Sequence, residues 1–285
     1  MNNIIVKCLG GLGNQMFQYA FYRRLQLDGN NVLLDISEFD SYDLHNGFEL
    51  DNIFGLKIKF ADISTTRQIK SRVSSVSKLT KIIWKMFDSG PIIIQKYFGF
   101  KQKYLYYKNK YLEGYWQSEK YFAKYADVIR NDFRFAEFDE VNKRYVSEIK
   151  QTNSVSLHVR MGDYVNHPLH GGICTPEYYK KAVEIINLNV SNPQFFIFSN
   201  DIEWCENNLK LENVVYVTGN IGEDSYRDMQ LMSMCKHNII ANSSFSWWGA
   251  WLNSNPDKII IAPSRWFNDT KINTKDLLPE SWIQI

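Results

Sequence analysis

The strongest constraint on the fold is the alternation of apolar runs and helical stretches in the second half of the chain. Short runs rich in Val, Ile and Phe are separated by longer stretches whose apolar residues recur every three or four positions. Such alternation is typical of a parallel sheet with helices on both faces. The predicted strands are Ser154–Val159, Gln194–Ser199, Val214–Val217, Asn238–Ala241 and Lys258–Ala262, and the predicted helices are Pro176–Leu188, Asp201–Leu209, Asp224–Cys235 and Phe245–Asn253.

The start of the chain has the same organisation. A strand at Ile4–Leu9, a glycine loop at Gly10–Asn14, a helix at Gln15–Leu27 and a strand at Val32–Ile36 open a doubly wound sheet. A chain of 285 residues is long enough for two such domains. We therefore predict an α/β fold with two Rossmann-like domains, 1–150 and 151–285, and a cleft between them.

The segment between the two clear patterns is basic. From Ile63 to Leu112 it holds eleven Lys or Arg and one acid, Asp88, whereas the whole chain carries a net charge of +2. A single amphipathic helix is predicted over Arg67–Phe87, and further helices over Tyr115–Phe133 and Glu137–Thr152. The charge suggests an anionic partner. An anionic membrane surface and an ordinary solvated helix face both remain open, and no nucleic-acid-binding motif is present.

The cysteines and the N-terminus bear on the compartment. Cys8, Cys174, Cys205 and Cys235 show no paired spacing, which favours reduced thiols in a cytoplasmic protein. We find no pattern of a signal peptide and no apolar run long enough to span a membrane.

The glycine loop is the first candidate for ligand binding. Gly11, Gly13 and Asn14 stand just before a helix, whose free amides favour anions. A nucleotide-dependent oxidoreductase would have a third glycine where this chain has Met16, although Asp35 is placed to bind a ribose. That class is weakened but remains open.

The stretch Leu157–Tyr164, LHVRMGDY, is the second candidate. Polar side chains at the carboxyl end of a buried parallel strand usually face a ligand. Arg160 is suited to clamp a phosphate, and His158 and Asp163 flank it. An Arg–Asp pair that only fixes a loop is the alternative.

Other predicted strand ends also carry polar residues. Asn242, Ser243 and Ser244 precede the helix with Trp247, Trp248 and Trp251, and they combine N-cap chemistry with a phosphate-ready helix start. The three Trp are expected in the core. Asp201 follows another strand and either caps a helix or binds a base or ribose, and Asp228 is a further candidate for a polar contact.

Three motifs together indicate a family. GGLGNQMFQYAFYRRL, HVRMGDY and NSSFSWWGAWL, in this order, resemble the motifs of bacterial-type α-1,2-fucosyltransferases from Gly10 to about Pro263. The resemblance implies a GT-B architecture, GDP-fucose as donor, a galactose-terminated acceptor and no metal or other cofactor. It assigns Arg160 to the donor diphosphate. The family's second adjacent arginine is replaced here by Met161.

The resemblance also implies an inverting transfer from GDP-β-L-fucose to a galactose 2-hydroxyl, in surface polysaccharide or O-antigen synthesis. Ser243 and Ser244 are expected to support Arg160, and His158 with Asp201 or Asp228 to hold guanine and ribose. Asp163 is a candidate base, and an orienting contact with Arg160 is an equal alternative for this side chain. An oxocarbenium-like reaction that uses no strong protein base is a third possibility. The domain 1–150 is expected to bind acceptor and 151–285 donor, and the basic segment to contact a cytoplasmic membrane face. A sugar-binding protein without activity is the third class that remains open.

Overall fold

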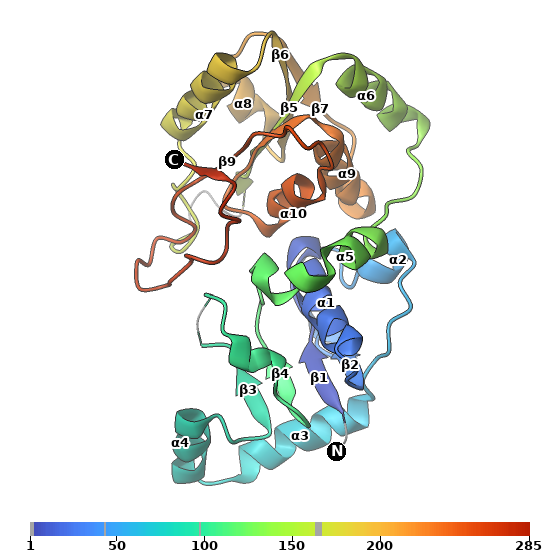
Figure 1. The fold of residues 1–285 in the computed structure, drawn as a ribbon, viewed down its shortest axis with the longest axis vertical. Coiled ribbons are helices and arrows are strands. Elements are labelled where there is room, and N and C mark those ends of the chain that lie inside the picture. The colour runs from blue at the N-terminus through green and yellow to red at the C-terminus, as the bar shows by residue number, and fades with distance from the viewer. Residues whose placement is uncertain (1–2, 43, 97, 163–166) are drawn as a thin grey trace. The chain divides into compact units, whose positions relative to one another are not determined.

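The computed structural model describes residues 3–42, 44–96, 98–162 and 167–285. The chain forms two compact units: unit 1 comprises Met1–Arg134 and Lys275–Leu277, and unit 2 comprises Phe135–Thr274 and Leu278–Ile285 (Figure 1). Each contains one parallel sheet, with strand order β2-β1-β4-β3 in unit 1 and β10-β9-β8-β5-β6-β7 in unit 2. The α/β prediction with two Rossmann-like halves is confirmed.

Unit 2 is the better predicted half, because its two longest strands are buried on both faces. Its strands are β5 (Asn153–Val159), β6 (Pro193–Ser199), β7 (Val214–Val217), β8 (His237–Ile239), β9 (Ile260–Ala262) and β10 (Ile283–Gln284). Its helices are α6 (Glu140–Gln151), α7 (Pro176–Asn189), α8 (Ile202–Asn208), α9 (Tyr226–Met234) and α10 (Ser244–Leu252). Each strand and helix predicted here is present within a few residues, and only β10 is missed.

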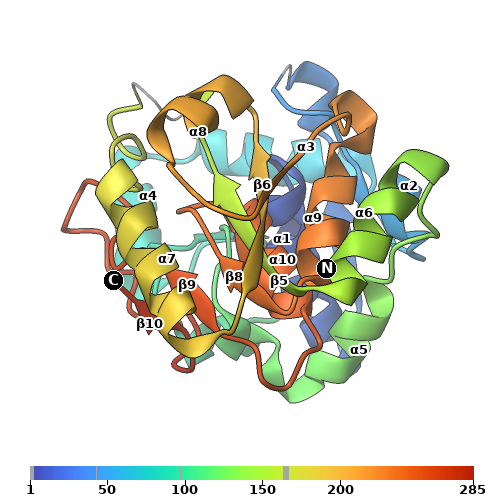
Figure 2. The same cartoon turned by 90° about the horizontal axis from the view of Figure 1, so that it is seen from above.

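Alternate residues of the strands fill two cores. Val155, Leu157 and Val159 of β5 pack with α7 and α8, whereas Phe196 and Phe198 of β6 pack with α6 and α9. Figure 2 shows α7 on one side of this sheet and α6 and α9 on the other. Since α6 contributes to this core, the boundary lies between residues 134 and 135, earlier than the predicted position near 150.

The three tryptophans of α10 are core residues, as predicted. Trp247 and Trp248 are fully buried and Trp251 nearly so, and the rings of Trp247 and Trp251 stack at 6.2 Å. Gly249 lets α10 lie against α9, because a Cβ atom there would be 2.9 Å from Cβ of Met232. The tryptophans therefore fix the helix whose first turn reaches the sheet edge.

Unit 1 departs further from expectation. Its strands are β1 (Ile4–Lys7), β2 (Val32–Asp35), β3 (Ile92–Ile94) and β4 (Tyr111–Glu113), and its helices are α1 (Leu12–Leu27), α2 (Leu50–Phe54), α3 (Ile63–Ser75), α4 (Lys78–Phe87) and α5 (Ala126–Asp132). The sequence predicted neither β3 nor β4. Helix α1 begins three residues before the predicted start, within the glycine loop.

Two helix predictions in unit 1 are wrong. The single helix expected over Arg67–Phe87 is broken, because Ser77 turns extended and its hydroxyl accepts the amide of Thr80 as an N-cap. The helix expected over Tyr115–Phe133 is α-helical only in α5. Trp116 has a φ of 55°, is fully buried and stacks on Phe21 at 4.1 Å, so aromatic packing overrides the local helical pattern.

No helix in the described part of the chain has the length and apolar composition needed to cross a membrane. All four cysteines are free, three of them buried and Cys174 half-buried. The burial of three of them agrees with the prediction of mostly structural thiols.

Candidate functional site

The candidate site in unit 2 is the carboxyl edge of its sheet. Neighbouring strands β8, β5, β6 and β7 are parallel, so the residues that follow them gather at one edge. Those residues are Asn242–Ser244, Arg160, Asn200 and Asn220. The sequence predicted this clustering for the first two segments and for Asp201.

His158 is the next-to-last residue of β5, close to this edge. Its side chain is 6% exposed, and its Nδ1 atom has no hydrogen-bond partner among the described residues. Burial, with the charge of Arg160 in addition, lowers the pKa of His158 to about 3. The imidazole is therefore neutral at physiological pH, with one buried nitrogen that has no hydrogen-bond partner among the described residues.

His158 also lies beside the first turn of α10. Its ring is 5.9 Å from the ring of Phe245, and its carbonyl oxygen accepts a hydrogen bond from the Tyr179 hydroxyl at 3.1 Å. The strand end that carries His158 and Arg160 is thus next to a helix start.

The backbone after Arg160 is held by the neighbouring strand's end. Asn200 follows β6, and its Oδ1 accepts the amide of Met161 at 3.0 Å. Gly162 has a φ of 59° and leaves room for the Asn200 amide, which a Cβ atom at that position would overlap. Asn200 therefore positions the segment that presents Arg160. Asp163, the candidate base, and Tyr164 lie outside the described residues.

Asp201 serves a structural purpose. Its Oδ1 accepts the amide of Trp204 at 2.9 Å, which caps α8, and its own amide donates to Ser199 Oγ at 3.0 Å. The sequence left two roles open for Asp201, a helix cap and a ligand contact, and the structure shows the N-cap of α8. Its predicted contact with guanine or ribose stays a prediction.

Asn242 and Ser243 are also held by the protein. The Asn242 amide donates to the carbonyls of His170 and Trp266 at 3.1 and 3.2 Å and fixes two loops at the strand end. Ser243 is the N-cap of α10 and accepts the amide of Phe245 at 3.3 Å. Ser244, the first residue of α10, is half-buried. Asn242 and Ser243 thus have partners within the protein, and the predicted donor contacts of Asn242, Ser243 and Ser244 stay predictions.

Asp228 belongs to a polar cluster that the sequence did not reveal. Asn142 of α6 and Asn220 exchange two amide hydrogen bonds of 2.9 and 3.0 Å, and Asn220 donates to Asp228 Oδ1 at 2.8 Å. Burial raises the pKa of Asp228 to about 7, although the bond from Asn220 opposes this. Because Asn220 follows β7, the cluster lies at the same edge as Arg160.

The glycine loop in unit 1 is built by glutamines. Gln15, fully buried, donates to the carbonyls of Gly10 and Gly47 at 2.8 and 2.7 Å and accepts the amide of Glu49 at 2.9 Å. Gly10 has a φ of 105°, and Gly11 is the N-cap of α1. These bonds shape the loop before the helix, a role that the sequence pattern did not assign to Gln15.

The residues predicted to bind donor from this loop have protein neighbours. Asn14 Oδ1 accepts a hydrogen bond from Gln117 at 2.7 Å, and a Cβ atom at Gly11 would be 3.2 Å from the His45 ring. Gly13 lies in the first turn of α1. Asp35, the ribose partner of an oxidoreductase, is 2% exposed and accepts the Tyr111 hydroxyl at 2.7 Å. That carboxylate is engaged inside the protein, which further weakens the oxidoreductase interpretation.

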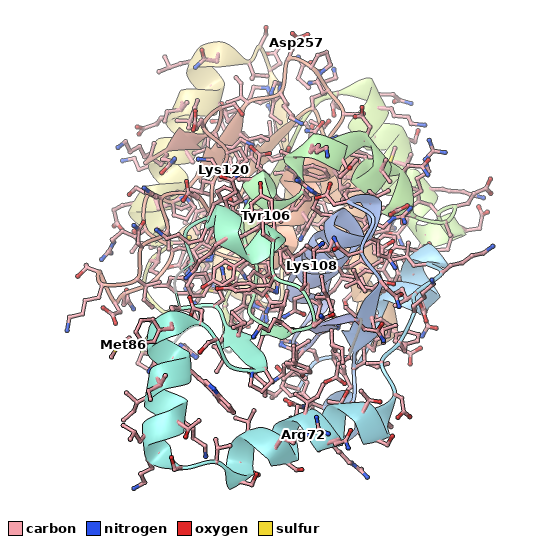
Figure 3. All side chains as sticks on the ribbon, turned by 60° about the horizontal axis from the view of Figure 1, so that its bottom comes forward. Arg72, Met86, Tyr106, Lys108, Lys120 and Asp257 are labelled. Atoms are coloured by element: carbon pink, nitrogen blue, oxygen red, sulfur yellow. The ribbon has the colours of Figure 1, made fainter. Side chains whose placement is uncertain are left out.

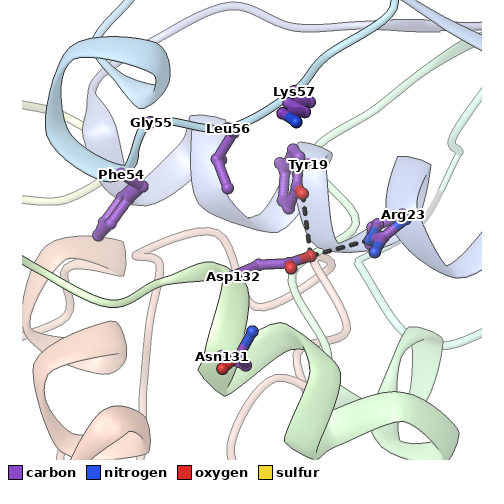
Figure 4. Close-up of a pocket in the computed structure, with 8 residues that line it drawn as sticks. All are labelled: Tyr19, Arg23, Phe54, Gly55, Leu56, Lys57, Asn131 and Asp132. Carbon is purple, nitrogen blue, oxygen red and sulfur yellow. Dashed lines mark hydrogen bonds and ion pairs between the residues drawn. The ribbon is translucent and has the colours of Figure 1, made fainter.

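A separate polar pocket of about 330 Å³ lies within unit 1 (Figure 4). Asp132 is one of its lining residues, and its Oδ2 accepts hydrogen bonds from Tyr19 Oη and Arg23 Nε, each at 2.9 Å. None of the residues predicted to bind the donor lines it. The described residues contain no group of three or more His, Cys, Asp or Glu that could hold a metal ion.

This fold and sheet edge define a class of protein. The structure of the fucosyltransferase NodZ from Bradyrhizobium superposes with a TM-score of 0.52 at 13% identity, over 87% of this chain and 91% of NodZ. The likeness shows the fold alone, that of GT-B glycosyltransferases.

Sequence comparison gives the family. The model described as Glycosyl transferase family 11 matches residues 2–285, and the chain belongs to this family. An "Alpha-1,2-colitosyltransferase" of Escherichia coli is 35% identical over 301 residues, covering 100% of this chain and 99% of the relative. The "O-antigen biosynthesis glycosyltransferase WbnK" of Escherichia coli is 35% identical, covering 98% and 99%. "Galactoside alpha-(1,2)-fucosyltransferase 2" of Mus musculus is 24% identical, covering 90% and 70%. The family resemblance read from the three motifs is confirmed.

Proposed function

We propose that this glycosyltransferase moves L-fucose from GDP-β-L-fucose to the 2-hydroxyl of a terminal galactose, in O-antigen or other surface polysaccharide synthesis. The observation that carries the proposal is Arg160 at the carboxyl end of β5, beside a neutral buried His158 and the start of α10. A guanidinium next to helix amides suits a diphosphate whose charge grows as the bond to the sugar breaks.

The reaction is a single displacement. The galactose oxygen forms a bond to the anomeric carbon from the face opposite GDP, the bond to the β-phosphate oxygen breaks with its electron pair, and the 2-hydroxyl proton leaves. The β-linked donor therefore gives an α-linked product. Arg160 and the amides after Ser243 stabilise the leaving diphosphate, and Asp163 is a candidate acceptor for the proton.

Ligand roles are divided between groups at the sheet edge. Neutral His158, whose Nδ1 atom has no partner among the described residues, is assigned to guanine or ribose, and Asp228 carries a carboxyl group in the polar cluster at the same edge. Gly11, Gly13 and Asn14 of unit 1 would contribute backbone and amide contacts to the sugar nucleotide. No metal is required in this scheme, because Arg160 and the helix supply positive charge to the diphosphate.

A second donor is favoured by one comparison. The relative that is 35% identical over the whole chain is named a colitosyltransferase, so GDP-colitose is the alternative. Fucose and colitose differ by the 3-hydroxyl, which colitose lacks. A site that hydrogen-bonds this hydroxyl would reject colitose strongly, whereas an apolar site would accept both.

The test is a donor and acceptor panel with the purified chain. GDP-fucose, GDP-colitose and a UDP-sugar are each offered with galactose-terminated acceptors, with and without EDTA, and the product's anomeric configuration is read by NMR. We expect α-1,2 transfer from a GDP-sugar that EDTA does not affect. Thermal shift by NAD and not by GDP would instead support an oxidoreductase, and GDP-sugar binding without transfer a sugar-binding protein.

We further propose that the enzyme acts in the cytoplasm, in peripheral contact with the inner membrane face. Four free cysteines support a reducing compartment, and the +10 charge between residues 63 and 112 supports an anionic surface.

A further inference from the structure

The helix α4 of unit 1 has an apolar face that the protein does not cover. None of its ten residues is buried. Five large apolar side chains are 46–71% exposed, namely Leu79, Ile82, Ile83, Met86 and Phe87. Monomeric proteins seldom gather so many exposed apolar side chains on one short element unless the surface has a partner.

The helix has one face toward the protein and the apolar face away from it. At about 100° of rotation per residue, the five apolar side chains fall in an arc of about 140°. Trp84 projects from the other side, and it is the residue that a Cβ atom at Gly90 would meet at 3.0 Å. Figure 3 shows Met86 on the outer side of α4. Trp84 thus anchors the helix, and the apolar arc faces solvent.

Lysines flank this apolar arc. By the same rotation, Lys78, Lys81 and Lys85 fall together within about 60° along one edge of it. All three are exposed. The single acid of the basic segment, Asp88, is bound by Lys96 at 2.9 Å and by Lys103, so its charge is already matched. The edge of the arc is therefore positively charged.

The neighbouring helix α3 lacks these features. Its Ile69 is 3% exposed and packs with Ile5 and Tyr111 against the sheet of unit 1. The predicted single basic amphipathic helix is thus two helices: α3 covers the core of unit 1, and α4 does not. The exposed apolar surface without a protein partner belongs to α4.

We propose that α4 docks unit 1 onto an anionic lipid surface, with its apolar arc in the acyl–headgroup boundary and its lysines on the headgroups. An apolar arc with lysines beside it is the pattern of helices that lie in a membrane interface. A second copy of the chain fits less well, because five side chains expose on the order of 500 Å², short of the roughly 800 Å² per partner in stable dimers.

The exposed apolar and basic residues that support membrane docking all belong to α4. The benefit of docking for catalysis rests on the proposed function, since a membrane-held enzyme reaches a lipid-linked galactose acceptor by diffusion in two dimensions. Transfer to a soluble acceptor should not need α4.

The test is flotation of the full chain with vesicles containing 30% phosphatidylglycerol or only phosphatidylcholine. We expect binding to the anionic vesicles that weakens with salt. Replacing Lys78, Lys81 and Lys85 by Gln should weaken it on the order of a hundredfold, at about fivefold per lysine. The matched control replaces Lys180, Lys181 and Lys210 of unit 2 by Gln and should change little.

A second pair of variants separates apolar insertion from charge. Leu79→Gln with Met86→Gln should reduce anionic-vesicle binding at least tenfold, whereas Val141→Gln with Leu188→Gln, exposed elsewhere, should not. The proposal would be overturned if wild type did not bind anionic vesicles, or if the control variants lost as much vesicle binding as the α4 variants. It would also be overturned if wild type formed a concentration-dependent dimer that Leu79→Gln with Met86→Gln abolished. Transfer to a soluble galactoside is measured in parallel. Its absence from every variant and from wild type would refute the proposed function while leaving vesicle binding as evidence on α4.

Discussion

Gly162 offers the sharpest test of how the sheet edge presents Arg160. Gly162→Ala places a Cβ atom on a residue with a φ of 59° and against the side-chain amide of Asn200. The left-handed conformation costs about 1–2 kcal/mol for a residue with a side chain. Displacing Asn200 also breaks its hydrogen bond to the Met161 amide, at about 1 kcal/mol.

Together these terms disfavour the observed loop by about 2–3 kcal/mol. If donor binding requires that loop, the affinity for GDP should fall roughly 30- to 150-fold, because the binding-competent state is populated that much less. Isothermal titration with GDP measures the loss. Thermal unfolding should change little, since a surface loop can move without disturbing the two cores of unit 2.

The matched control is Gly55→Ala in unit 1. Gly55 has a φ of 61°, and no atom lies within 4 Å of its added Cβ, so the substitution imposes the strain without the overlap. Its GDP affinity should equal wild type. Asn200→Ala with Gly162→Ala should cost less than the sum of the single variants, because the overlap disappears. GDP affinity within threefold of wild type in folded Gly162→Ala would refute the role assigned to this loop.

Three further outcomes follow from the structure. Arg160→Ala should lower turnover by 10²–10³ without changing the thermal midpoint, whereas Arg265→Ala, exposed in the same unit, should not lower turnover. The pKa of Asp228 is about 7 in the folded chain and 3.8 in the unfolded chain. Unfolding therefore releases a proton between pH 3.8 and about 7, and the free energy of unfolding falls as the pH rises through this range. Asp228→Asn should therefore gain at least about 1 kcal/mol over wild type at pH 8 and little at pH 4 in denaturant unfolding; a constant difference would contradict this. Gln15→Leu removes three hydrogen bonds, two of them buried and one part-buried, and should cost about 3 kcal/mol, against less than about 1 kcal/mol for Gln26→Leu on the same helix.

The sequence was most informative where burial alone decides structure. In unit 2 each long strand is buried on both faces, so its apolar run is readable without knowledge of its neighbours. β3 and β4 of unit 1 have three residues each, between Lys- and Tyr-rich segments, and exist because they pair with each other and β4 with β1. Pairing of that kind leaves no periodicity in so short a run.

The site was predictable as a place more than as a set of contacts. The predicted strand ends located the site at the carboxyl edge of the sheet in unit 2. A polar side chain at that edge can hydrogen-bond to a helix amide, to a loop carbonyl or to a ligand. Asp201 takes a helix amide and Asn242 takes two loop carbonyls. Asn200 and Asn220 hold neighbouring segments. The hydrogen-bond partner that each side chain has in the folded protein depends on loops from elsewhere in the chain, such as those at His170 and Trp266.

Met161 shows how strand alternation decides a question that the motif left open. The family pattern has an arginine here, and its loss raised the question of whether diphosphate binding suffers. Residues of β5 alternate between faces, and the Met161 side chain packs with Val159 against the core formed with α7 and α8, whereas His158 belongs to the opposite face. An arginine at 161 would therefore lie with the loop and α7–α8, away from the α10 start. Met161→Arg should change GDP affinity less than about twofold and cost about 1 kcal/mol of stability through lost apolar contact, measured by titration and unfolding. A tenfold gain in GDP affinity would show that position 161 reaches the diphosphate and that two arginines, not one, form the clamp.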